Sequence, residues 1–344
     1  MAGKSRNSRL DRILSAARAH FSAPVLRVTA PGGEGRSSYR LHFEDREVIA
    51  TLRPNFRRTH LEAFVLDALA PHCSDIPENL GVVGEIMFQG DVGRRRLNQE
   101  IMACDQAQQI ELTAEAVEAI FRIQAAARKT RLGEMMPHLG TNDDWVRNFV
   151  DAVDALQPYS GGIDRRFDRA AACEAVAAKG AQFVKWDCRS GNAAIGDDDR
   201  VRWFDFEYSG LRHGAEDLAW LIGDEAWPLS PQIMELIVED CFDPGCGHSP
   251  DAYMDYLAVY LTFHCIRRFK LIVKESAKRG WLDKDRVRRF DDAGVHPEFA
   301  AHICEVGRHF AARSRLTAPL ARTFEGARDS FLDVLRDAPE LRTA

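Results

Sequence analysis

Three oxygen-bearing side chains stand beside short apolar runs and could together hold a metal ion. Asp187 lies in a polar loop, Asn192 begins the run 192–195, and Asp205 follows the run 201–204. A turn of one Gly and three Asp separates the two runs, which is typical of a hairpin. Antiparallel pairing would bring Asp205 beside Asn192, with Asp187 just upstream. Such ligands suit Mg²⁺ held against phosphates. In phosphoryl transfer one carboxylate accepts hydrogen from the attacking hydroxyl, while an Asn and a second Asp hold the metal ions.

The spacing Asp187-x-x-x-x-Asn192 followed by Asp205 resembles the catalytic loop and metal-binding aspartate of kinases. The run Asp205-Phe206-Glu207 with Asp217-Leu218-Ala219 downstream is similar to the aminoglycoside phosphotransferase and choline kinase-like family. By this resemblance Asp187 is the catalytic base, Asn192 and Asp205 bind magnesium, and Asp217 braces the catalytic loop. The alternative is an ordinary polar turn, because Ser, Gly and Asn favour turns for local backbone reasons.

The loop departs from the family pattern directly before the base. The family usually has His-Gly there, and this chain has Lys185-Trp186. Arg189 stands where protein kinases carry a Lys and this family commonly a His. A guanidinium at this position could steady the transferred phosphoryl group.

The first hundred residues favour a small sheet with one main helix between its strands. A helix is expected over Leu10–Phe21 and a second over Thr59–Leu69. Five strands would form the antiparallel sheet. They are Val25–Thr29, Tyr39–Phe43, Val48–Leu52, Val82–Phe88 and Arg95–Met102.

A glycine-rich segment between the first two strands could approach nucleotide phosphates closely. Gly33 and Gly35 would allow backbone N–H groups near a phosphate, and Ser37 or Ser38 would add a hydroxyl. A dinucleotide-binding fingerprint is not expected, because no third Gly follows and the next segment alternates as a strand does. A plain hairpin turn remains the alternative.

The resemblance also assigns Arg53, after the third strand, to the phosphate-pairing position where the family has Lys. Glu62 would be its acidic partner from the following helix. Alternatively, Thr59 and Glu62 form a capping box, in which Glu62 reaches back to the helix start. The adenine-contacting hinge is expected at Glu100 to Met102, where an ordinary strand end is the alternative.

From Leu112 onward the sequence has helical periodicity, so the second lobe is expected to be mainly α-helical. The fold class is thus predicted as α+β, with the bilobal protein kinase-like fold. Residues 1–102 would form a nucleotide-binding lobe and residues 103–344 a catalytic and acceptor-binding lobe. The expected helices are Leu112–Ala127, Asp144–Leu156, Arg169–Lys179, Glu216–Ile222, Pro231–Cys241, Tyr253–Ser276, Pro297–Arg313 and Phe324–Leu335.

Composition excludes some classes of partner. The net charge of −6 argues against nonspecific nucleic-acid binding, which needs a basic face. The sequence contains no apolar run of membrane-spanning length, and its N-terminus lacks the apolar centre of a secretory signal. A cytoplasmic location is therefore expected, and composition leaves the oligomeric state open.

Eight cysteines are scattered along the chain, so reduced thiols are expected. Cys241, Cys246 and His248 could supply three zinc ligands if a fourth came from elsewhere, which leaves a zinc enzyme as one alternative. Buried or loop thiols explain the same residues.

The expected function is transfer of the γ-phosphoryl group of ATP, with Mg²⁺, to a hydroxyl of a small molecule such as an aminoglycoside, sugar or amino alcohol. Glu207, Asp224 and Glu225 could line an acidic pocket for a cationic acceptor, or they could be a solvated face. The alternative function is a nucleotide-binding regulatory module that keeps the fold and has lost transfer.

Overall fold

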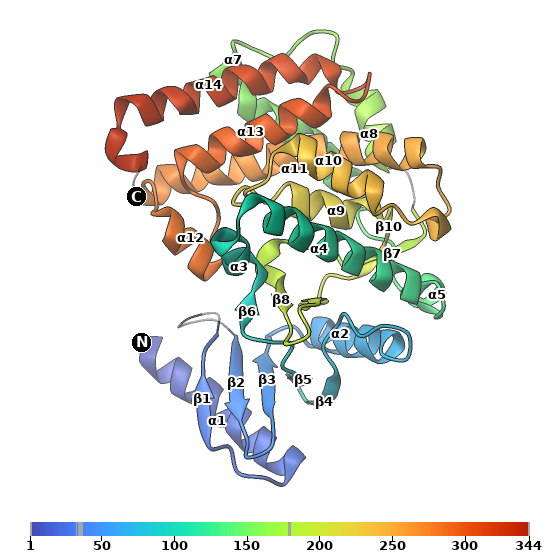
Figure 1. Ribbon diagram of the computed structural model, residues 1–344, viewed down its shortest axis with the longest axis vertical. Helices are drawn as coiled ribbons and strands as arrows, with labels where there is room; N and C mark the ends of the chain where they lie inside the picture. Colours follow the sequence, from blue (N-terminus) through green and yellow to red (C-terminus); the bar gives the residue numbers. More distant parts are fainter. Residues whose placement is uncertain (1, 32, 34–36, 178–179, 343–344) are drawn as a thin grey trace.

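The chain folds into a small lobe built on a sheet and a larger lobe built mainly of helices (Figure 1). The computed structural model describes residues 2–31, 33, 37–177 and 180–342. The small lobe contains a five-stranded antiparallel sheet in the order β1-β2-β3-β5-β4. Its strands are β1 (Arg27–Thr29), β2 (Ser38–His42), β3 (Glu47–Leu52), β4 (Asn79–Val83) and β5 (Ile86–Gly90).

Alternation along the strands gives this sheet one apolar face and one polar face. Tyr39 and Leu41 of β2 are buried against α1 (Ala2–Phe21), whose Ile13 belongs to the same apolar cluster. Ser38 and Arg40, between and beside them, line a cavity on the opposite face. Because side chains of a strand alternate between faces, the strands that build the core also present polar groups to that cavity.

The helix α2 (Phe56–Leu69) begins three residues earlier than its predicted start. Asn55 caps it, and its side chain accepts a hydrogen bond from the backbone N–H of Arg58. Thr59 therefore lies inside the helix rather than at its cap, which makes the capping-box alternative wrong and leaves Glu62 available for contacts across the lobe.

Two of the five predicted strands are wrong. The range 82–88 contains the end of β4, a turn at Gly84 with φ of +62°, and the start of β5. The range 95–102 is a two-residue strand, β6 (Arg95–Arg96), followed by the helix α3 (Leu97–Ala103). Leu97 and Ile101 are one helical turn apart and both are buried, so the period is helical over a segment too short to reveal it by sequence. The count of five strands is nevertheless correct.

From β6 onward the chain pairs and packs with the larger lobe. The boundary between the lobes after Met102 stays a prediction. Two small sheets lie in this lobe, β10 with β7 and β6-β8-β9. Their strands are β7 (Gln182–Val184), β8 (Ala193–Ile195), β9 (Val201–Trp203) and β10 (Gly210–Arg212). The α-helices that follow α3 are α4 (Gln106–Ala127), α5 (Leu132–Met135), α6 (Asp143–Val150), α7 (Gln157–Ser160), α8 (Arg169–Ala177), α9 (Ala215–Ile222), α10 (Pro231–Asp240), α11 (Pro250–Arg279), α12 (Lys284–Phe290), α13 (Pro297–Ala311) and α14 (Ala321–Asp337).

Each predicted helix of this lobe overlaps an observed one, although η1 (Asp151–Leu156), a 3₁₀ segment, continues α6, and the helices α3, α5, α7 and α12 were not predicted. Lys179, the predicted end of the helix over residues 169–179, lies outside the described residues. The helix α12 contacts α3, where the Asn98 side chain donates to the carbonyl of Arg288 at 2.6 Å.

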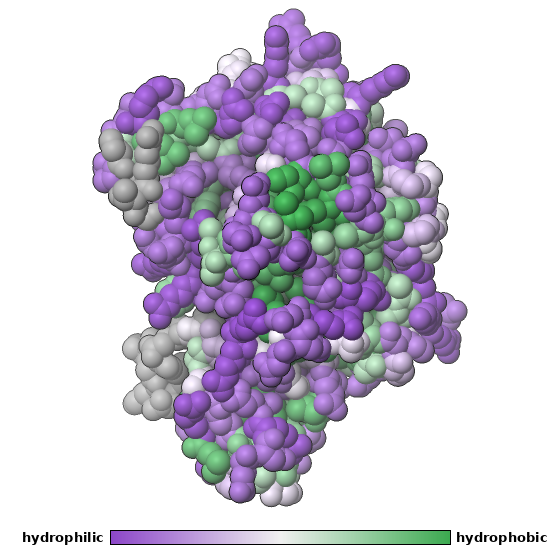
Figure 2. Space-filling view, viewed as in Figure 1, coloured by the Kyte–Doolittle hydropathy of each residue, from purple (hydrophilic) through white to green (hydrophobic). Residues whose placement is uncertain are grey.

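The face of the molecule in Figure 2 is mostly hydrophilic, with a compact hydrophobic patch at the level of α10. Leu236 of that helix is an exposed large apolar side chain. Among the described residues, no helix combines the length and apolar character needed to cross a membrane.

Candidate active site

The hairpin of β8 and β9 positions two of the three predicted oxygen ligands. Ala193 pairs with Trp203 and Ile195 with Val201, and the N–H of Phe204 donates to the carbonyl of Asn192 at 3.0 Å. The predicted antiparallel pairing is therefore confirmed. Asn192 enters the hairpin where Asp205 leaves it, and both line one cavity.

Asp187 is held by side chains of its own loop. Its Oδ1 accepts from Nε of Arg189 at 3.0 Å, and its Oδ2 accepts from Nδ2 of Asn192 at 3.1 Å. The same amide also donates to the backbone carbonyl of Asp187 at 2.9 Å. The carboxylate is thus oriented by two donors, as a general base must be.

The backbone before Asp187 is unusual, because Trp186 and Asp187 both have positive φ, at 58° and 50°. The buried carboxylate of Asp217 accepts the backbone N–H groups of Lys185 at 3.0 Å and of Trp186 at 2.7 Å. Gln124 donates to it as well, at 3.0 Å. These bonds hold a strained turn in place, since each non-glycine residue with positive φ costs about 1–2 kcal/mol.

Lys185, the departure from the family pattern, supports the loop from inside. Its side chain is buried, and its Nζ donates at 3.3 Å to the carbonyls of both Trp186 and Asp187. The ammonium lies 5.4 Å from the ring centre of Phe206 and 5.9 Å from that of Trp203. Aromatic faces and carbonyl oxygens together satisfy a cation that burial removes from water.

Arg53 joins the small lobe to the hairpin of the larger one. It donates to Glu62 through Nη1 and to Oδ1 of Asp205 through Nη2 at 2.6 Å, and its Nε lies 3.0 Å from Oε2 of Glu207. Glu62 also accepts the backbone N–H of Phe206 at 3.0 Å. The structure therefore brings Arg53 and Glu62 together in the expected pair, and Asp205 shares the same guanidinium.

A cavity of about 440 Å³ lies between the polar face of the sheet and this hairpin. Ser37, Arg53, Asn192 and Asp205 line it, together with the connection that follows β5. Five arginines of the described chain line it, which suits a polyanionic ligand such as a nucleoside polyphosphate. They are Arg40, Arg53, Arg94, Arg96 and Arg289.

The groups at Asn192 and Asp205 fit a divalent cation. Among the described residues, Oδ1 of Asn192 and Oδ2 of Asp205 make no hydrogen bond, so each has an oxygen available for a ligand. Burial raises the pKa of Asp205 to about 6, against the opposing charge of Arg53. Because ionisation of Asp205 is costly at this buried position, a neighbouring metal cation would stabilise its charged carboxylate.

Among the described residues, the remaining ones that were predicted to contact the nucleotide do not line this cavity. Gly33 has φ of +87°, and a Cβ added to it would lie 3.1 Å from the ring of Phe290, so Phe290 packs against it. Gly35 lies outside the described residues. Glu100 and Met102 belong to α3 and do not line the cavity, where the residues after β5 stand instead. The hinge at Glu100 to Met102 stays a prediction, without support from this geometry.

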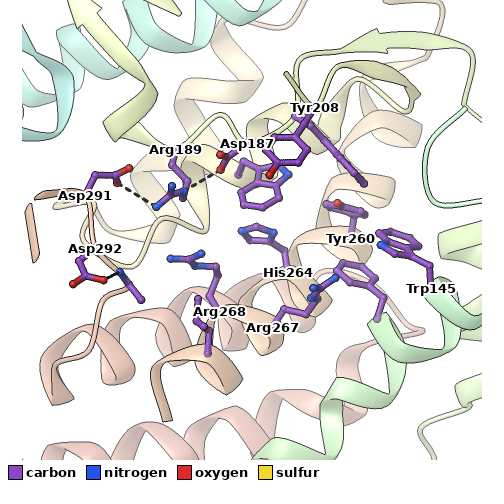
Figure 3. Close-up of a pocket in the computed structure, with 15 residues that line it drawn as sticks. Trp145, Asp187, Arg189, Tyr208, Tyr260, His264, Arg267, Arg268, Asp291 and Asp292 are labelled. Atoms are coloured by element: carbon purple, nitrogen blue, oxygen red, sulfur yellow. Dashed lines mark hydrogen bonds and ion pairs between the residues drawn. The ribbon is translucent and has the colours of Figure 1, made fainter. Parts of the chain in front are cut away.

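A second cavity, of about 590 Å³, is lined by Asp187 and Arg189 and has aromatic walls (Figure 3). Arg189 stands between Asp187 and Asp291, with its Nη1 at 3.2 Å from Oδ1 of Asp291. Asp291 lines both cavities, so they adjoin at this point. The aromatic residues of the second cavity are Trp145, Phe149, Trp186, Tyr208, Trp220 and Tyr260.

The acidic-pocket prediction is wrong, because its three members serve other partners. Glu207 pairs with Arg53, Asp224 accepts from the backbone and hydroxyl of Ser190 at 3.1 and 2.5 Å, and Glu225 pairs with Arg268 at 2.6 Å. Asp224 and Glu225 are buried, and none of the three lines the aromatic cavity.

The zinc alternative is also wrong for the described part of the chain, where no group of three or more His, Cys, Asp or Glu side chains could hold a metal. Cys241 contacts the carbonyl of Ala114 at 3.9 Å, whereas His248 contacts Oε1 of Gln182 at 3.1 Å. All eight cysteines are free thiols.

Sequence reasoning missed the residues that α11 and α12 contribute to the second cavity. Arg267 and His264 belong to α11, and Asp291 follows α12 with φ of 47°. No short motif marks them. The one available signal was the spacing of Tyr260, His264 and Arg267, which places them on one face of a helix.

The fold is shared with solved phosphotransferase structures, although no family model and no curated protein matches the sequence. A choline/ethanolamine kinase family protein from Mesorhizobium loti is 16% identical with a TM-score of 0.53, over 94% of this chain and 99% of that one. A putative aminoglycoside phosphotransferase from Ralstonia eutropha is 15% identical with a TM-score of 0.52, over 94% and 98%. The GDP complex of wild-type aminoglycoside 2'-phosphotransferase-IIIa is 10% identical with a TM-score of 0.53, over 80% and 96%.

At such low identities these likenesses describe the fold and leave substrates open. The predicted α+β class and the bilobal arrangement are both confirmed. The chain therefore has the protein kinase-like fold, and its resemblance to aminoglycoside phosphotransferases and choline kinases is confirmed at the level of that fold.

Proposed function

We propose that this protein transfers the γ-phosphoryl group of ATP to a hydroxyl group of a small molecule. The observation that carries the proposal is that Asp187 lines the second cavity and bonds to Asn192, which lines the first cavity beside it. The first is lined by arginines, Asn192 and Asp205, and the second by aromatic side chains. A nucleotide in the first and an acceptor in the second would meet at Asp187. Solved structures of the same fold include a GDP complex and enzymes named for small-molecule phosphorylation, which supports this assignment.

In this reaction the acceptor oxygen forms a bond to the γ-phosphorus. The bond between that phosphorus and the bridging oxygen to the β-phosphorus breaks, and its electron pair leaves with ADP. Asp187 accepts the hydroxyl proton and later releases it to solvent. The carboxylate is aimed for this task by Arg189 and Asn192, so positioning supplies much of the catalysis.

Asn192 and Asp205 would hold Mg²⁺, and Arg53 would contact the phosphates. Magnesium, when bound, supplies neutralisation of the phosphate charge. Arg53 orders both ends of this site, because it contacts Glu62 of α2 and Asp205 of the hairpin. Arg189 would add positive charge near the transferred group, since its guanidinium stands beside Asp187 and lines the acceptor cavity.

A screen of hydroxyl compounds for ATP-dependent phosphorylation tests the proposal. It should contain aminoglycosides, sugars, amino alcohols and hydroxy acids, with mass-spectrometric detection of a phosphorylated product. We expect turnover on one class of acceptor and its loss in Asp187→Ala. Full activity of Asp187→Ala on the true acceptor would overturn the role of Asp187. Binding of Mg-ATP with no turnover on any acceptor would favour the regulatory-module alternative.

A further inference from the structure

Aromatic rings of the second cavity, the proposed acceptor cavity, already make cation–π contacts with arginines of the protein. Three of the six lie under a guanidinium carbon, and Trp145 in addition stacks on Phe149 with ring centres 5.1 Å apart. An ammonium ligand over the ring of Phe149 would compete with Arg267, which itself lines the cavity, and would meet its positive charge. The pairs are Arg212 over Trp145 at 5.3 Å, Arg267 over Phe149 at 5.7 Å and Arg58 over Tyr208 at 4.3 Å.

The acidic side chains of the cavity are occupied by other partners. Asp187 and Asp291 both contact Arg189, and Asp292 accepts from Arg279 at 2.9 Å. A cationic acceptor would have to displace one of these ion pairs. The cavity therefore offers little free negative charge to a ligand.

Arg267 is the charged lining residue whose guanidinium has no carboxylate partner among the described residues. The neighbouring Arg268 is held by both oxygens of Glu225, at 2.6 and 2.8 Å. In the described part of the chain the guanidinium of Arg267 contacts the ring of Phe149, and the residue is exposed although it lines the cavity. Its five N–H donors are thus available to an anionic group that enters from solvent.

Arg267 lies on the face of α11 that forms one wall of the cavity. Tyr260, His264, Arg267 and Leu271 follow one another at steps of four, three and four residues, and all four line the cavity. Figure 3 shows His264 and Arg267 rising from this helix toward the aromatic rings. The exposed Lys274 continues the same face by three residues, so positive charge extends from the cavity along the helix.

Two buried nitrogen atoms of lining residues, one on α9 and one on α11, also lack a hydrogen-bond partner in the described chain. They are Nε1 of Trp220 and Nε2 of His264, whose rings pack edge to face with centres 4.5 Å apart. Burial lowers the pKa of His264 to about 3, so its ring is neutral at pH 7 and does not pair with a carboxylate as a cation. The indole N–H donates only, which matches an oxygen-bearing ligand group.

We propose that the acceptor is a hydroxy compound with an anionic group, such as a carboxylate, and a flat apolar body, and that Arg267 binds the anionic group. The inference rests on the proposed function and names the substrate class of the same site. The apolar body would contact the aromatic walls, and the hydroxyl would face Asp187. Arg267 is then a specificity-determining residue.

Three probes on one frame test the charge preference. They are 4-(hydroxymethyl)benzoate, neutral 1,4-benzenedimethanol and the trimethylammonium analogue 4-(hydroxymethyl)benzyltrimethylammonium. Binding is measured by quenching of tryptophan fluorescence, because Trp145, Trp186 and Trp220 line the cavity. Phosphorylation with Mg-ATP is followed separately by mass spectrometry. We expect the benzoate to bind about tenfold or more tighter than the neutral probe, as a charge-assisted hydrogen bond would give.

Arg267→Gln should remove this preference and leave binding of the neutral probe unchanged. Lys270→Gln, on the same helix but outside the cavity lining, is the matched control and should keep the preference. Tightest binding of the trimethylammonium probe, an unchanged preference in Arg267→Gln, or an equal effect of Lys270→Gln would overturn the inference.

The two proposals fail in distinguishable ways. If the benzoate binds through Arg267 but no hydroxyl compound is phosphorylated, the proposed function fails while anion recognition stands. If neutral or cationic compounds are phosphorylated with no dependence on Arg267, the proposed function stands and the anionic acceptor is refuted.

Discussion

Replacing Asp217 by asparagine is expected to slow phosphoryl transfer while leaving nucleotide binding nearly intact. Asp217 touches neither cavity, but its two oxygens accept the backbone N–H groups of Lys185 and Trp186. Asparagine has one acceptor oxygen and one NH₂ group. If its oxygen keeps the bonds to Lys185 and Gln124, the N–H of Trp186 faces another donor and loses its partner.

The magnitude follows from the balance between these bonds and the strain of the turn. A hydrogen bond to a charged group contributes about 1.5–3 kcal/mol. The positive φ angles of Trp186 and Asp187 cost about 1–2 kcal/mol each. Loss of one bond therefore removes stabilisation of about the same size as the cost of one positive φ angle. The population of the turn conformation that orients Asp187 for catalysis then falls. We expect kcat to fall about 10- to 100-fold.

The assay is steady-state phosphorylation of the acceptor found by the screen, with kcat and the KM for ATP measured separately. Asp105→Asn is the matched control, because Asp105 also accepts a backbone N–H, at 2.9 Å, and asparagine is an equally good helix cap. The bracing role of Asp217 is refuted if Asp217→Asn keeps the wild-type kcat while thermal unfolding shows that its stability has fallen.

Three further changes test other parts of the site. Glu62→Gln removes the charge of the fully buried carboxylate that pairs with Arg53, while Arg53 keeps Asp205 and Glu207 as partners, so we expect the free energy of unfolding to drop by about 1.5–3 kcal/mol in chemical denaturation, whereas an unchanged value would show that the pair adds nothing. Since the pKa of Asp205 is raised to about 6, its carboxylate is charged above that pH and becomes protonated below it. Mg-ATP affinity measured by calorimetry should therefore fall about tenfold per pH unit below 6, and a flat profile from pH 7 to 5 would contradict the assignment of Asp205. Lys185→Met keeps the length of the side chain but removes its bonds to two loop carbonyls, so kcat should fall about tenfold, while Lys270→Met, at an exposed position of α11, should not change it.

The sequence predicted the hairpin and the helices because their signals are local. Asn192 and Asp205 are brought together by a tight turn whose Gly and Asp residues are typical of turns. The helices of the larger lobe have apolar residues at helical spacing over several turns. The segment 95–102 failed for the opposite reason. Its buried Leu97 and Ile101 give a single helical repeat, which a short apolar run conceals.

Long-range partners could not be predicted from local patterns. Arg53 was expected to meet Glu62, but its contacts to Asp205 and Glu207 depend on how the two lobes pack. The acidic pocket failed because formal charge says nothing about which carboxylates already have partners. The difference between Arg267 and Arg268 likewise exists only in the folded chain, where Arg268 pairs with Glu225 and Arg267 lies over the ring of Phe149.

Calorimetric titration of Mg-ATP into the wild-type protein, Asp205→Asn and Asp187→Asn, alongside acceptor turnover, tests the central claim most directly. Asp205→Asn should weaken Mg-ATP binding by about tenfold or more, because it removes a charged ligand. Asp187→Asn should bind Mg-ATP like the wild type and lose about 100-fold or more in turnover, as removal of a general base does. Wild-type Mg-ATP affinity in Asp205→Asn, or wild-type turnover in Asp187→Asn, would contradict the account.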